Sequence, residues 1–277
     1  METTELTVLW RIVRSAVPTG ILAIVWLSSA WGANSQLSED AVNSASIANW
    51  AEGKDTQPDP FIVRVQVLLD RANMSPGVID GYLGDNLTKA IRSFEVRESL
   101  DADGNIDEKF WTALSSDSAP VLETYEIAAD DLSQRYVEKI PEDYAEMAEM
   151  KWLGYTGPKE MLAERFHMDQ SLLDLLNPNV DFASAGSKIV VASRGKDIAT
   201  KVSRIVVDRS DGELMAYSDD RMIAAYPATI GSANNPSPSG THRIKAVVKD
   251  PSYTYNPDKN FQQGDNDKPL EIPAACD

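Results

Sequence analysis

The sequence has little cysteine, histidine and basic charge, and each shortage excludes a class of protein. Its only cysteine is Cys276, which excludes an intramolecular disulfide and a cysteine-rich metal site. The two histidines, His167 and His242, are too few for a histidine-rich zinc site, so we expect no metal and no cofactor. The 43 acidic residues outnumber the 26 lysines and arginines, giving a formal net charge of −17. That balance leaves no basic surface for nucleic acid.

A long hydrophobic run is also missing, although a short one lies near the N-terminus. Arg11 and Arg14 precede an apolar run at 17–31, shorter than the roughly 20 residues of a membrane span. This order is typical of a signal peptide, which we assign to residues 1–32. An uncleaved N-terminal anchor is the alternative, and it would be the only contact with a membrane. Both interpretations predict export to the periplasm or cell envelope. The Ala-, Ser- and Asn-rich residues 33–59 are predicted to be a linker.

Residues 60–116 are predicted to form a compact three-helix unit. Apolar residues recur at helical spacing within Phe61–Asn73 and again from Leu87 to Phe94. A third, short helix carries Phe110 and Trp111. Glycine-containing turns separate the three helices.

Acidic and amide side chains stand where these helices would begin. Asp85 or Asn86 is expected to cap the second helix, and Asp107 the third. The acidic run around Gly104 could instead be a calcium loop, which needs glycine at its sixth position and glutamate at its twelfth. Here Gly104 is fourth and Thr112 is twelfth, so we favour a turn followed by a helix cap.

Four segments of this unit form a recognisable series: Val65–Leu69, Ile79–Gly84, Ala90–Phe94 and Asp103–Asp107. The series resembles the peptidoglycan-binding-1 module, a three-helix wall-binding domain with an internal repeat. One departure is Glu95, where that family usually has glutamine. Most of the matching positions are core or turn residues, so they identify the fold better than a ligand contact.

Residues 120–195 are predicted to form a strand–helix–helix–strand unit. Thr124–Ile127 and Lys188–Val191 are the expected strands. The inward-facing residues would be Leu162, Ala163 and Phe166 in the first helix and Leu172, Leu173, Leu175 and Leu176 in the second, which Asp169 is expected to cap.

Within this unit, Leu175–Pro178 and Gly186–Ile189 resemble the lysin motif (LysM), a βααβ glycan-binding module. An acidic insert near 137–159 separates its first strand from its helices. Because residues 117–195 hold 15 acidic and 7 basic side chains, we expect a solvated face there. His167 is expected to be a surface or capping residue with no ligand role.

Residues 200–277 change to a β pattern. Short runs joined by tight turns predict an antiparallel sheet packed as a sandwich or barrel. The expected strands are Val202–Asp208, Glu213–Ser218, Met222–Ile230 and Thr241–Val248, the last following a Pro/Ser/Asn/Gly loop at Ser232–Gly240.

Four segments carry a second resemblance: Ile205–Asp208, Leu214–Tyr217, Tyr226–Gly231 and the Pro-x-Pro-x-Gly-Thr loop Pro236–Thr241. They resemble the start of the L,D-transpeptidase (YkuD-type) catalytic domain, and Tyr253–Pro257 also fits. In that family a cysteine in a Ser-x-Gly-Cys-Arg-like stretch, activated by a histidine in a His-Gly stretch, attacks a stem-peptide carbonyl. The thiolate is the nucleophile, and an adjacent imidazole favours its formation.

Neither motif occurs in the sequence. Cys276 lies in Ile272–Asp277 without a preceding Ser-x-Gly, and His242 directly follows the Pro/Gly loop. We expect no dyad between them, because a thiol near a chain end lacks the fixed geometry of catalysis, and we assign no catalytic residue. We expect a premature end inside the catalytic domain, from a frameshift or an artificially shortened chain. The DNA beyond codon 277 would test this expectation.

The predicted fold class is therefore multidomain α+β: a three-helix peptidoglycan-binding module, a βααβ LysM-like module and an incomplete all-β L,D-transpeptidase catalytic domain. The resemblances imply an envelope protein that cross-links or remodels peptidoglycan, with stem peptides and glycan strands as partners. We expect this chain to be inactive. The alternatives are a non-catalytic peptidoglycan-binding protein and an exported globular protein that shares only folds.

Overall fold

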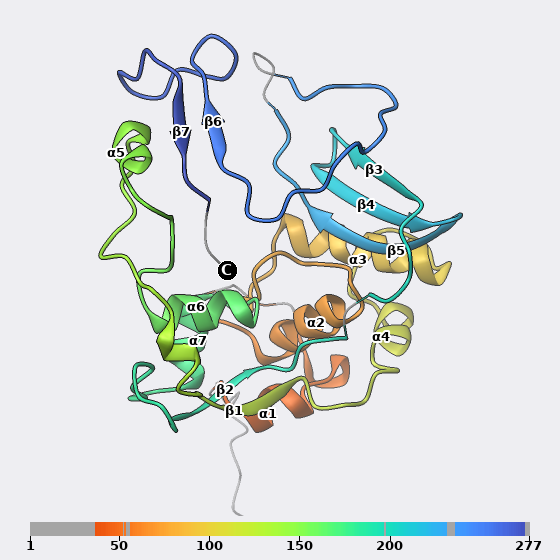
Figure 1. Ribbon diagram of the computed structural model, residues 1–277. Coiled ribbons are helices and arrows are strands. Elements are labelled where there is room, and N and C mark those ends of the chain that lie inside the picture. The colour runs from red at the N-terminus through yellow and green to blue at the C-terminus, as the bar shows by residue number, and fades with distance from the viewer. Residues whose placement is uncertain (1–36, 52, 54–55, 197, 232–235, 275–277) are drawn as a thin grey trace, which may run out of the picture. The chain divides into compact units, whose positions relative to one another are not determined.

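The computed structural model describes residues 37–51, 53, 56–196, 198–231 and 236–274 (Figure 1). The predicted signal peptide or anchor and Cys276 lie outside the described residues. Among the helices that the structure describes, none has the length and apolar character needed to cross a membrane. The described residues fall within one compact unit, Ser35–Asp277.

The three predicted helices of the N-terminal module are present: α2 (Pro60–Arg71), α3 (Asp85–Glu98) and α4 (Glu108–Leu114). The predicted cap by Asp107 is confirmed, because its carboxylate accepts a hydrogen bond from the Phe110 N–H at 2.8 Å. The predicted cap of α3 by Asp85 or Asn86 is wrong. Gly84 is the N-cap and Asp85 lies in the first turn, where its charge favours the positive end of the helix dipole.

Aromatic rings fill the core of this module. Phe61 contacts both Trp50 and Trp111, with ring centroids 5.2 and 4.9 Å apart. Phe94 and Phe110 meet edge to face at 5.6 Å, and Phe110 is fully buried. Such pairs add to the stabilisation from apolar burial.

Part of the predicted linker is structured, which differs from the sequence-based expectation. Helix α1 (Glu39–Ser44) and the 3-10 helix η1 (Ile47–Asn49) lie in it, and Val42 is fully buried. The Asn43 side chain accepts from the N–H groups of Val121 and Leu122, at 2.8 and 2.9 Å. These hydrogen bonds tie the segment to the middle unit.

The middle unit has the predicted order of elements: β1 (Leu122–Glu126), α6 (Pro158–Arg165), α7 (Gln170–Leu176) and β2 (Lys188–Ala192), with β1 and β2 antiparallel. Asp169 caps α7 as predicted. Leu175 is 53% exposed, so its predicted place on the apolar side of α7 is wrong. Buried Asn177 joins the end of α7 to β2, accepting from the Val190 N–H and donating to the Leu173 and Val190 carbonyls.

The acidic insert is not simply a solvated face. It holds the short helix α5 (Tyr144–Ala148), which contacts β7, and the 3-10 helix η2 (Asp131–Ser133) lies just before it. The ring of Tyr144 meets those of Tyr253, Tyr255 and Phe261, with centroids 5.3 to 6.1 Å apart. The insert therefore packs against a segment more than 100 residues later, a long-range contact that charge counting could not predict.

The C-terminal region contains two small antiparallel sheets. One is β3 (Arg204–Asp208), β4 (Glu213–Ser218) and β5 (Arg221–Pro227); the other is β6 (Tyr253–Tyr255) paired with β7 (Leu270–Ile272). The predicted strand at 241–248 is wrong: these residues form no ladder, and Val247 is 90% exposed. The described strands of this region form one three-stranded and one two-stranded sheet, which differs from the predicted sandwich or barrel.

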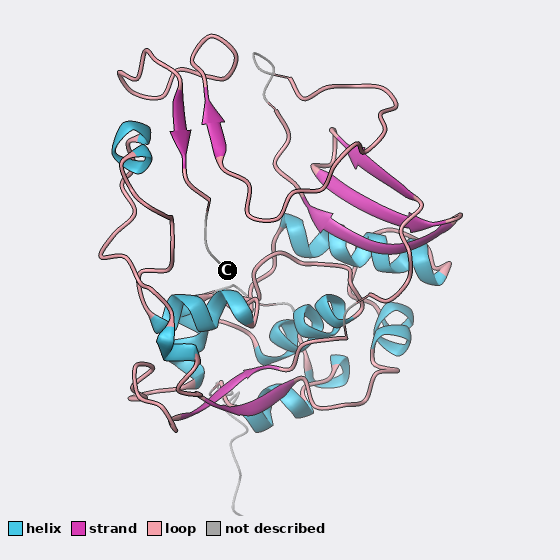
Figure 2. Ribbon diagram, in the orientation of Figure 1, coloured by secondary structure: helices cyan, strands magenta, loops and turns pink. Residues whose placement is uncertain are grey.

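The outer edge of β5 is covered by the N-terminal module. The Ala225 N–H donates to the Asn73 carbonyl at 2.9 Å, and the Ser75 N–H donates to the Ala225 carbonyl at 2.8 Å. Strand β5 also lies against α3 (Figures 1 and 2). There Ser93 donates a buried hydrogen bond of 2.8 Å to Glu213, the first residue of β4. The edge of β5 that does not face β4 is thereby paired at Ala225.

Glu95, the departure from the family's usual glutamine, offers a stability test. It is 3% exposed, and its carboxylate accepts from the Gly104 N–H at 2.9 Å. Burial raises its pKa, and the neighbouring charges of Asp103 and Asp107 add to this, although the Gly104 hydrogen bond opposes it. Because the pKa is raised in the folded state, the ionised side chain opposes folding once the pH exceeds the pKa that the side chain has in the unfolded chain.

We expect Glu95→Gln to raise the free energy of unfolding at pH 7 by about 1 kcal/mol, because the amide oxygen still accepts from Gly104 without a buried charge. The gain should disappear as the pH falls to about 4, where the wild-type carboxyl is protonated. Urea denaturation at both pH values measures it. Glu98→Gln, on the same helix but 38% exposed in its side chain, is the control and should change stability by less than about 0.5 kcal/mol.

Candidate functional site

A groove in the N-terminal module is the first candidate binding surface. It has a volume of about 480 Å³ and lies between the loop after α2 and the first turns of α3. Its lining mixes apolar and polar side chains, among them Val78, Asp80, Tyr82, Leu83, Asn86 and Lys89. Such a mixture suits a ligand that has both apolar faces and hydrogen-bonding groups.

Buried Gln66 holds the loop that forms this groove. Its side-chain carbonyl accepts from the N–H groups of Asp80 and Gly81, at 3.1 and 2.8 Å, and its amide donates to the Asp80 carboxylate at 2.8 Å. That carboxylate also accepts from the Tyr82 N–H at 2.9 Å. The backbone at 80–82 is thus fixed by side chains, and the side chain of Tyr82 is placed beside the groove.

Gly81 is required by the same loop. Its φ is +80°, and a Cβ there would lie 2.7 Å from the Pro58 Cβ and 2.9 Å from a methyl of Val63. Any larger residue would therefore be both strained and in collision with the start of α2. The Ile79–Gly84 turn recognised in the sequence is thus a packing requirement of the groove.

Of His242 and Cys276, the structure describes His242 alone. His242 is exposed, and its Nε2 lies 3.1 Å from the Ser239 carbonyl oxygen, with no other partner among the described residues. Cys276 lies outside the described residues, so the expectation that the two form no dyad stays a prediction. Within the described residues, no cluster of three or more His, Cys, Asp and Glu side chains could hold a metal ion.

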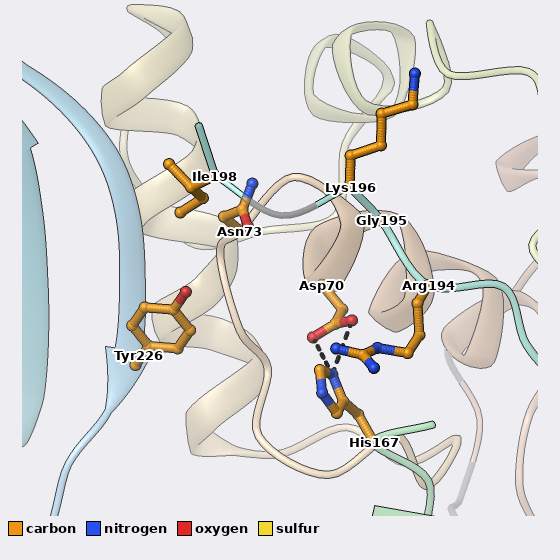
Figure 3. Close-up of a pocket in the computed structure, with 8 residues that line it drawn as sticks. All are labelled: Asp70, Asn73, His167, Arg194, Gly195, Lys196, Ile198 and Tyr226. Carbon is orange, nitrogen blue, oxygen red and sulfur yellow. Dashed lines mark hydrogen bonds and ion pairs between the residues drawn. The ribbon is translucent and has the colours of Figure 1, made fainter. Parts of the chain in front are cut away.

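A second cavity lies where the N-terminal module, the middle unit and the β3–β5 sheet meet, and we call it the junction pocket (Figure 3). Its volume is about 260 Å³. The residues that line it include Asp70 in the last turn of α2, Asn73 just after that helix, His167 after α6, Arg194 and Gly195 after β2, and Tyr226 on β5.

Sequence reasoning placed His167 at the surface and missed this pocket. Its side chain is 42% exposed, and its Nδ1 lies 3.0 Å from both carboxylate oxygens of Asp70. His167 and Asn73 both have left-handed backbone, with φ of 56° and 61°. No sequence signal joins Asp70 to a histidine 97 residues later, so only the fold reveals the pair.

Across the pocket, the phenol of Tyr226 is 41% exposed. Partial burial raises its pKa, and the negative charge of Asp70 adds to that effect. The hydroxyl therefore stays protonated and able to donate a hydrogen bond at neutral pH. The pocket thus combines a donor, a carboxylate–imidazole pair and a guanidinium.

Two stretches of the chain match known protein families. Residues 202–274 match the L,D-transpeptidase catalytic domain (YkuD), and residues 58–114 match the peptidoglycan-binding-1 domain. The second stretch contains the whole groove, and the first contains both small sheets. The middle unit lies between the two matched stretches. No curated protein matches the chain.

Proposed function

We propose that this chain is a peptidoglycan-remodelling protein of the L,D-transpeptidase family and that it engages the wall through the groove of its N-terminal module. The observation that supports this proposal is the position of the groove: its lining lies inside the matched peptidoglycan-binding stretch. Peptidoglycan offers N-acetylated sugars and short peptides, and both have the apolar faces and amide groups that such a lining can contact.

The location follows from the same partner. A protein acting on peptidoglycan works in the cell envelope. Export to the periplasm is part of the proposal, supported by the signal-like order of charge and apolar residues near the N-terminus. We also propose that the middle unit is LysM-like and contacts glycan, a proposal supported by its βααβ order and its antiparallel β1–β2 pair.

We further propose that these 277 residues bind the wall without forming cross-links. The matched catalytic stretch contains no cysteine, and the one cysteine outside it lacks the surrounding Ser-x-Gly motif. The second candidate function is therefore that of a non-catalytic wall-binding protein, whereas the first is that of a peptidoglycan-remodelling enzyme. The chemistry of the family would need a thiolate held beside an imidazole.

Purified sacculi should bind the full chain, and Lys89→Ala or Tyr82→Ala should weaken that binding about five- to tenfold, because each removes one contact in the groove. Lys109→Ala is the matched control, since Lys109 is 73% exposed and lies outside the groove. Sedimentation of the chain with sacculi at increasing concentration gives the affinity.

Analysis of the same sacculi by muropeptide chromatography separates the two functions. Unchanged cross-link composition supports wall binding alone. New cross-links formed by this chain would show that it is catalytically active. Equal binding by the Lys89→Ala, Tyr82→Ala and Lys109→Ala variants would exclude the groove as the binding surface.

A further inference from the structure

One wall of the junction pocket is the segment after β2, and it is packed directly on α2. A Cβ at Gly195 would lie 2.9 Å from the Arg71 Cα and 3.0 Å from the Arg71 carbonyl oxygen. Arg71 is itself fixed, because its guanidinium donates to the Pro120 carbonyl and pairs with Asp117 at 2.8 Å. The backbone on either side of Gly195 is thus held by a contact that no larger residue permits.

This packing places positive charge at the pocket. Arg194 and Lys196 line it, and neither pairs with an acidic side chain among the described residues. Figure 3 shows Arg194 directed toward Asp70 and His167, whereas Lys196 extends away from them. Among the lining residues that the structure describes, Asp70 is the one carboxylate, and His167 contacts it. The Arg194 guanidinium has no acidic partner among the described residues, so it is available to an anion.

The remaining lining limits what that anion can be. The Tyr226 hydroxyl and the Asn73 side chain, both labelled in Figure 3, add neutral hydrogen-bonding groups. A volume of about 260 Å³ is below the roughly 300–1,000 Å³ of sites for drug-sized ligands, so it suits the end of a peptide better than a disaccharide. Guanidinium groups bind planar carboxylates in a two-point geometry.

We propose that the junction pocket binds the terminal carboxylate of a short peptide, with Arg194 as the principal contact and Tyr226 and Asn73 as neutral partners. The assignment of this peptide as a wall stem peptide, rather than a free peptide, rests on the proposed function. The recognition of a carboxylate does not depend on the proposed function. Because the pocket is lined by all three parts of the described chain, its ligand contacts all three.

The dipeptide D-alanyl-D-alanine is a suitable probe, titrated into the full chain by calorimetry. Its C-terminal amide is the matched ligand control, since it replaces the carboxylate by a neutral group of nearly the same size and shape. We expect the amide to bind at least tenfold more weakly than the acid, and Arg194→Gln to reduce binding of the acid by about the same factor. Lys188→Gln removes one exposed positive charge on β2, outside the pocket, and should leave binding within about twofold.

Three results would overturn the inference: equal affinity for the acid and the amide, unchanged affinity in Arg194→Gln, or inorganic phosphate displacing the dipeptide at equal concentration, which would indicate an unspecific anion site. The wall as source is tested separately, by competition between the dipeptide and stem peptides released from sacculi. Sacculus binding through the groove is measured with Lys89→Ala. If the dipeptide does not bind but sacculi do, the pocket inference fails and the proposed function stands. If the dipeptide binds but sacculi do not, the proposed function fails and the pocket inference stands.

Discussion

Gly81→Ala should lower the free energy of unfolding by about 2–4 kcal/mol and reduce the affinity for sacculi at least tenfold. The left-handed φ of +80° strains an alanine, and the added Cβ would collide with Pro58 at 2.7 Å. Relief of that collision would move the loop whose N–H groups bind Gln66. Urea denaturation gives the stability change, and sacculus sedimentation of the folded fraction gives the affinity.

Gly84→Ala is the matched control three residues later. Gly84 has an extended backbone with φ of −167°, and a Cβ there would meet nothing within 4 Å. As the N-cap of α3 it loses little on becoming alanine, so we expect a change of about 1 kcal/mol or less. If both variants were equally stable, the packing at Gly81 would not be what fixes the groove.

Asp131→Ala should destabilise the chain by about 2–4 kcal/mol. Asp131 is 6% exposed, and its carboxylate pairs with Arg165 and accepts from the Tyr125 hydroxyl and the Ala128 N–H, at 2.7 and 2.8 Å. Removal of one member of a buried pair costs about 3–5 kcal/mol, and the lower range reflects the 32% exposure of Arg165. Thermal or urea unfolding measures the loss.

Asp174→Ala provides the comparison, because Asp174 also pairs with a basic side chain, that of Lys159, but does so at the surface. The side chains of Lys159 and Asp174 are 37% and 50% exposed, and such pairs contribute about 0–1 kcal/mol. A loss at Asp174 as large as that at Asp131 would show that burial is not the cause.

The pH dependence of stability should carry the signature of Asp131. Burial alone would raise its pKa, but the hydrogen bonds from Arg165, Tyr125 and the Ala128 N–H together hold it below its usual range. A lowered folded pKa contributes stability above the unfolded pKa, near 3.9, that is lost as pH falls through the folded value. Unfolding free energies measured from pH 7 to 3 should therefore fall less steeply in Asp131→Ala than in the wild type.

Local patterns predicted much of the secondary structure. Apolar spacing predicted α2 and α3, and the caps at Asp107 and Asp169 are confirmed, because a cap depends on residues two or three positions away. Short runs between tight turns predicted β4 with its observed bounds. In each case the interacting groups are close in the sequence.

The wrong predictions concern contacts between distant residues. The sequence of Thr241–Val248 favours a strand, but a strand requires a partner, and β5 pairs with Asn73–Ser75 instead. The acidic insert is charged, yet Tyr144 within it finds an aromatic partner in Tyr255. Composition carries no information about such pairings.

The candidate sites divide in the same way. The Ile79–Gly84 turn, though not the groove that it forms, could be recognised in the sequence, because Gln66 and Gly81 belong to one short module. The junction pocket could not, because Asp70, His167, Arg194 and Tyr226 come from four separate elements. Only the backbone pairing of β5 with the loop after α2 brings Tyr226 and Asn73 to the same cavity.

The hydrogen bonds between Ala225 and the backbone of Asn73 and Ser75 also bear on how the chain can be dissected. Excision of residues 58–114 would leave β5 with bare amide and carbonyl groups and would expose the face of Glu213 that Ser93 now covers. An isolated 202–274 fragment should therefore self-associate, whether or not it has catalytic activity. Point substitutions in the intact chain, rather than domain deletions, are the means to separate wall attachment from any reaction.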